Sequence, residues 1–238
     1  MTAQPPAGRA APKAQLRAQV RLSRAAALDW RRPNRNSLRT SLVLELIESM
    51  FDASGLCVAT YLSRDSEPDT FGLVAGLVCR KVRVLVPAVG LGTPWTAPDW
   101  TWYGPPVVMG PRGIPMVGDS AIGTKSLGTE TLDVESLETK SPGAETPSAK
   151  SLGAEALGAE ALAEASVIIL PGLAGGRDGT RLGLGGGWYD RALCAAREDA
   201  ERWLLLNDDE VFDTVPTEAH DQRVHRLITP TQVIECSF

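Results

Sequence analysis

The sequence predicts an α/β fold: a three-layer domain built around a mostly parallel sheet. Short apolar runs of strand length, such as Val167–Leu170, alternate with longer amphipathic runs of helical length. A helical run at residues 71–80 lies between two expected strands, residues 58–62 and 82–86, which is typical of a right-handed crossover between parallel strands. The chain has 238 residues, of which 43% are hydrophobic, so it is large enough to bury a sizeable core.

The composition excludes several classes of protein. A net charge of −5 argues against nucleic acid as the main partner, because nucleic-acid-binding domains usually carry a basic face. The four cysteines are scattered with no CxxC pair, which indicates free thiols in a reducing compartment. No apolar run reaches about 18 residues, so we expect no membrane-spanning helix and a cytoplasmic location. Residues 1–12 are rich in Ala and Pro and are expected to be a disordered tail rather than a targeting peptide.

Two helices are expected before the first strand. Residues 13–27 interleave apolar residues with cations, and Lys13 and Arg17 stand four apart, so they share one face of a helix. Such a pair is either part of a solvated basic face or part of an anion site, and spacing alone leaves both open. Residues 37–51 carry apolar positions at helical spacing and predict the second helix.

The next part of the chain contains a candidate pocket loop and a cluster of aromatic residues. Residues 63–70 follow the expected strand 58–62 and carry signals for a helix start before the run at 71–80. Trp95, Trp100, Trp102 and Tyr103 follow the strand at 82–86. These rings could stack on a flat ligand, but packing over a sheet edge is the commoner arrangement and the one we expect.

The segment from Asp119 to Glu164 repeats short units built on Lys-Ser-Leu-Gly and Gly-Ala-Glu-Ala-Leu. Its first part, residues 119–150, has few large apolar residues and no aromatic residue, so it is expected to be disordered. Residues 154–164 have the composition of a helix that leads into the strand Val167–Leu170. We therefore expect one domain over residues 13–238, interrupted by a disordered or partly helical insertion at 119–164.

A glycine-rich stretch, residues 171–190, lies between the strand Val167–Leu170 and an expected helix at 191–200. A strand, a glycine-rich loop and a helix bring backbone N–H groups close to phosphate oxygens. Arg181 adds a planar cation suited to phosphate, and Asp190 could hold Mg²⁺ beside the phosphates. Neither common phosphate-binding fingerprint matches, so a flexible surface loop is the alternative interpretation.

The C-terminal part predicts a strand at 202–206, a short helix or turn at 210–215 and a strand at 226–228. His220 and Asp221 lie between these elements. From the residues alone, Asp221 is an exposed turn residue or a functional carboxylate, and His220 is expected to be a hydrogen-bonded packing residue.

The glycine-rich stretch resembles the signature of the 5-formyltetrahydrofolate cyclo-ligase family, which runs Arg-Leu-Gly-x-Gly-x-Gly-Tyr-Tyr-Asp. The residues that match are Arg181, Leu182, Gly183, Gly185, Gly187, Tyr189 and Asp190. Further matches occur in the family's order: the pair Lys13 and Arg17, then Leu62, Ser63, Glu67 and Thr70, and finally Val215, Pro216, His220, Asp221, Val224, Ile228, Thr229 and Pro230. The chain departs from the pattern at Met116-Val117, at Gly175-Gly176 and at Trp188, which replaces the first Tyr.

The resemblance implies an ATP- and Mg²⁺-dependent cyclisation of 5-formyltetrahydrofolate to 5,10-methenyltetrahydrofolate, without a covalent protein nucleophile. The ATP-binding residues that it implies are Lys13, Arg17, Arg181, Leu182, Gly183, Leu184, Gly185, Gly186, Gly187, Trp188 and Tyr189. It further implies a folate pocket that includes Leu62, Glu67 and Trp188, and a metal held by Asp190 and Asp221. The substrate is expected with or without a polyglutamate tail, and the protein is expected to be a monomer.

Two alternatives to this reading stay open. The acid Glu67 could instead stabilise the N-terminus of the helix that follows it. The departures from the pattern could mark a catalytically weakened relative that binds folate or nucleotide as a sensor.

Overall fold

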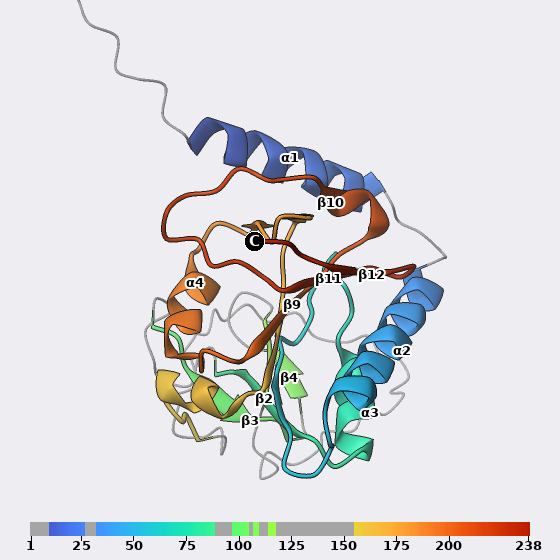
Figure 1. Ribbon diagram of the computed structural model, residues 1–238, viewed down its shortest axis with the longest axis vertical. Helices are drawn as coiled ribbons and strands as arrows, with labels where there is room; N and C mark the ends of the chain where they lie inside the picture. Colours follow the sequence, from blue (N-terminus) through green and yellow to red (C-terminus); the bar gives the residue numbers. More distant parts are fainter. Residues whose placement is uncertain (1–9, 27–31, 89–96, 105–106, 110–113, 118–154) are drawn as a thin grey trace, which may run out of the picture.

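The computed structural model describes residues 10–26, 32–88, 97–104, 107–109, 114–117 and 155–238 (Figure 1). Most of the expected tail, and the expected disordered segment 119–150, therefore lie outside the described residues. In chain order the elements are α1 (Ala10–Ala26), α2 (Arg32–Met50), β1 (Cys57–Ala59), α3 (Phe71–Cys79), β2 (Arg83–Pro87), β3 (Trp100–Trp102), β4 (Val107–Met109), β5 (Pro115–Val117), the 3₁₀ helix η3 (Ala159–Glu164), β6 (Val167–Leu170), β7 (Ala174–Gly176), β8 (Arg181–Leu182), α4 (Trp188–Ala192), η4 (Leu193–Ala195), β9 (Glu201–Leu205), η5 (Asp208–Glu210), β10 (Val211–Phe212), β11 (Arg226–Ile228) and β12 (Val233–Glu235).

Among the described residues, the central sheet has seven strands in the order β12-β11-β9-β6-β1-β2-β3. The five inner strands pair in parallel, and only the edge strands β3 and β12 run antiparallel to their neighbours. Buried positions dominate the inner strands, as expected when both faces of a parallel sheet are covered. The predicted mostly parallel α/β sheet is confirmed.

The connection from β1 through α3 to β2 is the crossover that the sequence predicts. Val58 of β1 pairs with Val84 of β2 in a parallel register, and α3 lies between the two strands in the sequence. Buried Leu73, Val74 and Leu77 on α3 face the sheet because they recur at the spacing of one helix face.

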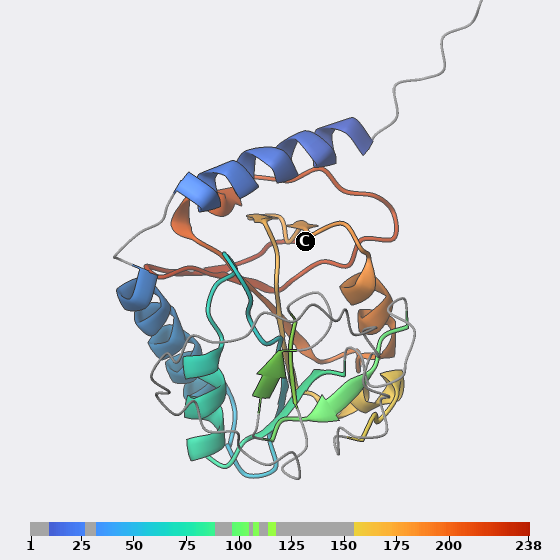
Figure 2. The ribbon, with the colours of Figure 1, turned by 180° about the vertical axis from the view of Figure 1, so that it is seen from behind.

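Helices cover both faces of the sheet (Figures 1 and 2). On one face α2 and α3 contribute Val43, Ile47 and Leu77 to the larger apolar core. On the other face η3, η4 and α4 pack with Leu162 and Leu193 buried. The three-layer arrangement is thereby confirmed, and none of the described helices is long and apolar enough to cross a membrane.

A small second sheet, ordered β10-β7-β8, lies between the central sheet and α1 (Figure 1). It is built around Gly175, where an added Cβ would lie 2.7 Å from Leu227 Cδ2 and 2.9 Å from Leu204 Cδ2. A side chain at this position would displace the ends of the leucine side chains that pack beneath β7. The departure at Gly175-Gly176 is thus a packing position in β7.

Two helices begin earlier than expected. Helix α1 begins at Ala10, so residues 10–12 are helical and not part of a tail. Helix α2 begins at Arg32 rather than at Ser37. Pro33 is compatible with this start because the first-turn N–H groups of a helix have no intrahelical partner.

Three expectations in the second half are wrong in type or extent. The expected helix at 191–200 is α4, which begins at Trp188 and ends at Ala192 before the short turn η4. The expected helix at 154–164 is the shorter 3₁₀ helix η3. Residues 211 and 212 form β10, which pairs with β7, instead of a helix or turn. In each case a tertiary pairing or a buried neighbour overrides local propensity.

Candidate functional site

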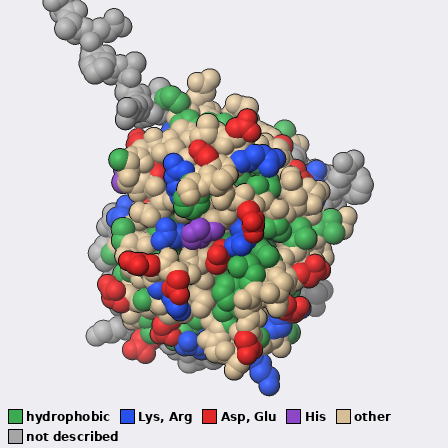
Figure 3. Space-filling view, in the orientation of Figure 1, with side chains coloured by type: hydrophobic (Ala, Val, Ile, Leu, Met, Phe, Trp, Pro, Cys, Tyr) green, Lys and Arg blue, Asp and Glu red, His purple; other side chains and the backbone are tan. Residues whose placement is uncertain are grey.

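A cavity of about 700 Å³ lies beneath α1, at the carboxyl ends of β1, β2 and β6. The cavity is lined by Tyr61 and Pro171, which follow β1 and β6 in sequence, and by Pro87, the last residue of β2. This edge of a parallel sheet is where ligands of α/β proteins bind, and the volume suits a small-molecule site. On the described part of the face in Figure 3 cations and acids are interspersed, so the cations of this cavity are best identified by their contacts.

Helix α1 directs a row of cations toward the cavity. Lys13, Arg17, Arg21 and Arg24 follow at intervals of four, four and three residues, so they lie on one helix face, and all four line the cavity. Lys13 is only 6% exposed, so the alternative of a solvated basic face is wrong for this residue. Lys13 and Arg17 were predicted from the sequence as site residues but Arg21 and Arg24 were not, although the same spacing extends to them.

The glycine loop between β8 and α4 contacts this row through its backbone. Arg17 Nε donates to the carbonyl of Gly183 at 2.9 Å, and Arg21 Nη2 donates to the carbonyl of Leu184 at 3.1 Å. Gly185 and Gly187 have φ values of +111° and +61°, which side chains with a Cβ rarely adopt. The two glycines let the chain turn sharply beneath α1, so Leu182 to Tyr189 line the cavity together.

Arg181 and Asp190, the two ends of the matched signature, form a partly buried ion pair. Arg181 Nη2 lies 2.5 Å from Asp190 Oδ1, and the side chain of Arg181 is 3% exposed. The amide of Gln222 also donates to Asp190 Oδ1 at 3.2 Å. Arg181 Nε is buried with no hydrogen-bond partner among the described residues, so part of this guanidinium remains to be satisfied.

Asp221 forms the second ion pair of the site. Its Oδ2 lies 2.6 Å from Lys13 Nζ and accepts a 2.6 Å hydrogen bond from the amide of Glu218. Burial opposes the charge on Asp221, but these hydrogen bonds outweigh it, and the pKa of Asp221 lies below its usual value. The side chain of Asp221 is 14% exposed and accepts hydrogen bonds from both Lys13 and Glu218, so Asp221 is not the exposed turn residue that the sequence left open as an alternative.

The segment around Asp221 also holds a group of potential metal ligands. One donor atom each from Glu218, His220 and Asp221 lies within 4.8 Å of the others. The two carboxylates suit a hard cation such as Mg²⁺, whereas imidazole does not. The side chain of His220 is 69% exposed, so the packing role expected for His220 is wrong. Asp190 is not in this group.

Glu67 lines the cavity together with Tyr61 and Leu62, and all three belong to the segment that follows β1. Its Oε2 accepts a hydrogen bond from the amide of Arg64 at 3.1 Å. Thr70 occupies the N-cap of α3, so Glu67 closes its own turn and does not cap the helix. Burial raises the pKa of Glu67 despite that hydrogen bond.

The loop that carries Glu67 is braced from both ends. The hydroxyl of Tyr61 donates to the carbonyl of Pro68 at 2.9 Å, and the hydroxyl of Thr70 donates to the carbonyl of Tyr61 at 2.7 Å. Ser63 and Thr70 exchange two further hydrogen bonds. The position of Glu67 is therefore set before any ligand binds.

Trp188 lines the cavity, and its ring also packs against two other aromatic rings. Its ring lies edge-on to Trp100, with centroids 5.3 Å apart, and edge-on to Tyr189 at 4.7 Å. Trp100 is fully buried in β3, which confirms the expected packing role for this member of the aromatic cluster. Trp95 lies outside the described residues. The other departure, Met116-Val117, is buried in β5, and neither residue lines the cavity.

Comparisons with known proteins agree with one another. The model of the 5-formyltetrahydrofolate cyclo-ligase family matches residues 9–230. A curated protein named 5-formyltetrahydrofolate cyclo-ligase, from Mycolicibacterium smegmatis, is 44% identical over 71 residues, which are 30% of this chain and 37% of that protein's own length.

Two solved structures share the fold. One is the 5,10-methenyltetrahydrofolate synthetase of Aquifex aeolicus, with a TM-score of 0.63 and 21% identity over 94% of this chain and 92% of that one. The other is a 5,10-methenyltetrahydrofolate synthetase of Mycoplasma pneumoniae, with a TM-score of 0.59 and 12% identity over 92% and 98% of the two chains.

Proposed function

The chain belongs to the 5-formyltetrahydrofolate cyclo-ligase family, and from that premise we propose that it converts 5-formyltetrahydrofolate and ATP to 5,10-methenyltetrahydrofolate, ADP and phosphate. One observation carries the proposal: residues of all the matched motifs, from Lys13 through Glu67 and Arg181 to Asp221, line a single cavity. These motifs lie far apart in sequence, and a reaction between two substrates requires them in one place.

Nucleotide recognition is assigned to the side of the cavity beneath α1. Lys13, Arg17 and Arg181 would neutralise the phosphates, and the glycine loop would bring backbone N–H groups close to them. Folate recognition is assigned to the loop that follows β1, where Leu62 offers apolar contact and Glu67 offers a carboxyl group to the polar edge of the pterin. Trp188 also lines the cavity and would contact either ligand.

The chemistry depends on position and charge more than on a protein nucleophile. The formyl oxygen attacks the γ-phosphoryl group and ADP leaves. N10 of the folate, losing its proton, then attacks the carbon of the resulting iminium phosphate, and phosphate leaves. Negative charge accumulates on the phosphate oxygens in the first step, so the cations of α1 and Arg181 lower its barrier by electrostatic stabilisation.

The donor set of the site fits the Mg²⁺ that the family's reaction implies. Asp221 and Asp190 are the proposed ligands, and Glu218 joins them because it lies within 4.8 Å of Asp221 in the ligand group. When bound, Mg²⁺ would neutralise the negative charge that develops on the phosphate oxygens.

An absorbance assay with 5-formyltetrahydrofolate tests the proposal. We expect the methenyl product to accumulate only when ATP and Mg²⁺ are both present, with one ADP released for each product formed. A sensor would bind folate or nucleotide without turnover. Binding of both ligands with no methenyl product and no ADP would contradict the proposed activity and favour the weakened relative.

A further inference from the structure

Arg24 and Glu210 form a buried ion pair between α1 and the turn that follows β9. Each side chain is 2% exposed. Arg24 Nε lies 2.6 Å from Glu210 Oε1 and Arg24 Nη2 lies 2.8 Å from Oε2, while the same Nη2 donates to the carbonyl of Gly172 at 2.7 Å. Burial opposes the charge on Arg24, but Glu210 outweighs that effect and the pKa of Arg24 is raised.

Glu210 is itself fixed to the backbone at the end of β9. Its Oε2 accepts from the amide of Asn207 at 2.9 Å, and its Oε1 accepts from Asn207 Nδ2 at 2.8 Å. Both carboxylate oxygens therefore have two partners, one from Arg24 and one from Asn207. A carboxylate held in this way offers a fixed docking point, whereas an exposed ion pair would not.

Helix α1 depends on such an anchor more than the other long helix does. It lies across one end of the molecule, away from the central sheet (Figure 2). Its apolar contacts belong to the smallest core cluster, through Leu16 and Val20, and Leu22 is 72% exposed. Of its four cations, Lys13, Arg17 and Arg21 contact groups at the proposed nucleotide site, where a bound phosphate would compete for them.

We infer that Arg24, acting through Glu210, is a positioning residue for the nucleotide site. Arg24 follows Arg17 by seven residues and Lys13 by eleven, which are close to two and three helical turns. Fixing Arg24 therefore sets both the rotation and the height of α1, and with them the positions of Lys13 and Arg17 over the glycine loop. The inference rests on the proposed function, because it assigns these two cations to ATP phosphates.

The structure supplies a matched control in the same network. Arg39 on α2 is 1% exposed and donates to the carbonyl of Leu206 at 3.1 Å and to Asn207 Oδ1 at 3.0 Å. A third bond reaches Asn36, whose Oδ1 also accepts from the amide of Asp69 at 3.4 Å. Arg39 thus ties the same turn to α2 and to the loop of Glu67, and these three hydrogen bonds reach no residue of α1.

The experiment compares Arg24→Lys with Arg39→Lys. Each variant keeps the charge and removes a guanidinium fork that joins separate segments. We expect both to lower the melting temperature. Only Arg24→Lys should raise the KM for ATP, by about tenfold, with the KM for the folate and kcat within about twofold, since displacing aligned groups weakens ligand contacts. Hydrogen exchange in α1 should rise in Arg24→Lys and stay unchanged in Arg39→Lys.

The outcomes separate this inference from the proposed function. Equal changes in the KM for ATP in the two variants, or no change in either, would show that Arg24 acts on stability alone. If Arg24→Lys does not fold, Glu210→Gln, which keeps the volume and one acceptor oxygen for Asn207 but removes the charge that pairs with Arg24, should show the same selective effect, and its absence would overturn the inference. If the wild-type protein turns over no folate, the proposed function fails, and hydrogen exchange in α1 still decides whether Arg24 positions the helix.

Discussion

Lys13 Nζ lies 2.6 Å from Asp221 Oδ2, so the cation assigned to ATP phosphate and the carboxylate assigned to the metal neutralise each other. Arg181 and Asp190 repeat this arrangement at 2.5 Å. ATP or Mg²⁺ alone would take one member of each pair and leave the other without a partner in a partly buried site, which is costly. ATP and Mg²⁺ together would supply partners for both. We therefore expect the two to bind with positive linkage, so that each raises the affinity of the protein for the other.

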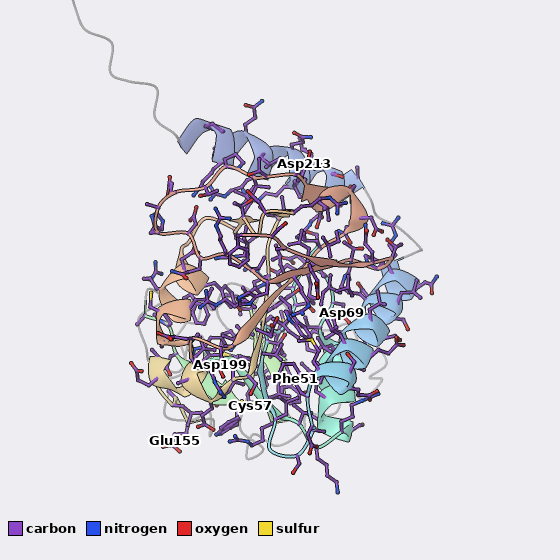
Figure 4. The ribbon with its side chains drawn as sticks, viewed as in Figure 1. Phe51, Cys57, Asp69, Glu155, Asp199 and Asp213 are labelled. Atoms are coloured by element: carbon purple, nitrogen blue, oxygen red, sulfur yellow. The ribbon has the colours of Figure 1, made fainter. Side chains whose placement is uncertain are left out.

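Neutralising either carboxylate should reduce turnover. Asp190→Asn and Asp221→Asn keep hydrogen-bond acceptors for Arg181 and Lys13 but lose the charge that Mg²⁺ requires, so we expect kcat/KM to fall by about a hundredfold or more. Steady-state kinetics over a Mg²⁺ titration measure the effect. Asp199→Asn is the control, because Asp199 is exposed, pairs with Arg197 and lies at the end of the molecule away from α1 (Figure 4). Unchanged Mg²⁺ dependence in both site variants would exclude the two-carboxylate metal site.

Removing the guanidinium of Arg17 should weaken nucleotide binding. Arg17→Ala loses charge-assisted hydrogen bonds to phosphate, each worth roughly 1.5–3 kcal/mol, so the KM for ATP should rise about ten- to a hundredfold. The KM for the folate should change much less. Arg21 is not a suitable control, because it contacts the glycine loop at Leu184.

Gln19→Ala on the exposed face of α1 provides the comparison for Arg17→Ala. It keeps a strong helix former and removes no contact with the cavity. If the two substitutions changed the KM for ATP equally, the role of Arg17 in phosphate binding would be refuted.

Glu67 should make folding stability depend on pH. Burial raises its pKa above the ordinary value of 4.5, so the folded state binds the proton more tightly than the unfolded state does. The stabilisation is complete below pH 4.5 and is lost as pH rises through the folded pKa. Relative to Glu67→Gln, the melting temperature of the wild type should therefore fall as pH rises above about 4.5. Glu198→Gln at an exposed site should run parallel to the wild type, and a parallel curve for Glu67→Gln would contradict the prediction.

Restoring the family's tyrosine at Trp188 should cost stability but not activity. Trp188→Tyr replaces the indole by a smaller ring and so reduces the edge-on contact with Trp100. An aromatic pair contributes roughly 0.5–1.5 kcal/mol, so we expect a fall of about 1–6 °C in melting temperature. Because the family places tyrosine here, kcat should stay within about threefold. Trp102→Tyr, which alters a ring beneath the guanidinium of Arg83, is the matched substitution outside the cavity. A large gain in kcat for Trp188→Tyr would instead support the hypothesis that the protein is a catalytically weakened relative of the family.

The sequence was sufficient where the constraint is local. Short, continuous apolar runs separated by helical runs predicted the parallel sheet, because a strand buried on both faces must be apolar at successive positions. The glycine-rich stretch predicted a loop with unusual backbone conformations, and Gly185 and Gly187 in the cavity lining have the positive φ values that favour glycine. Spacing on one helix placed Lys13 and Arg17 on one face, and the ordered motifs indicated the family.

Tertiary structure decided which groups meet. Lys13 and Asp221 are 208 residues apart, and no local pattern predicts that they pair. Arg24 has the same composition and spacing signal as Arg21, yet it is buried against Glu210 whereas Arg21 remains exposed. The helix expected at 191–200 gave way to a five-residue α4, because Gly187 starts the helix and the chain must return to β9. Periodicity and backbone conformation are properties of neighbouring residues, whereas ion-pair partners and burial depend on how distant segments pack, which the sequence specifies only through the whole fold.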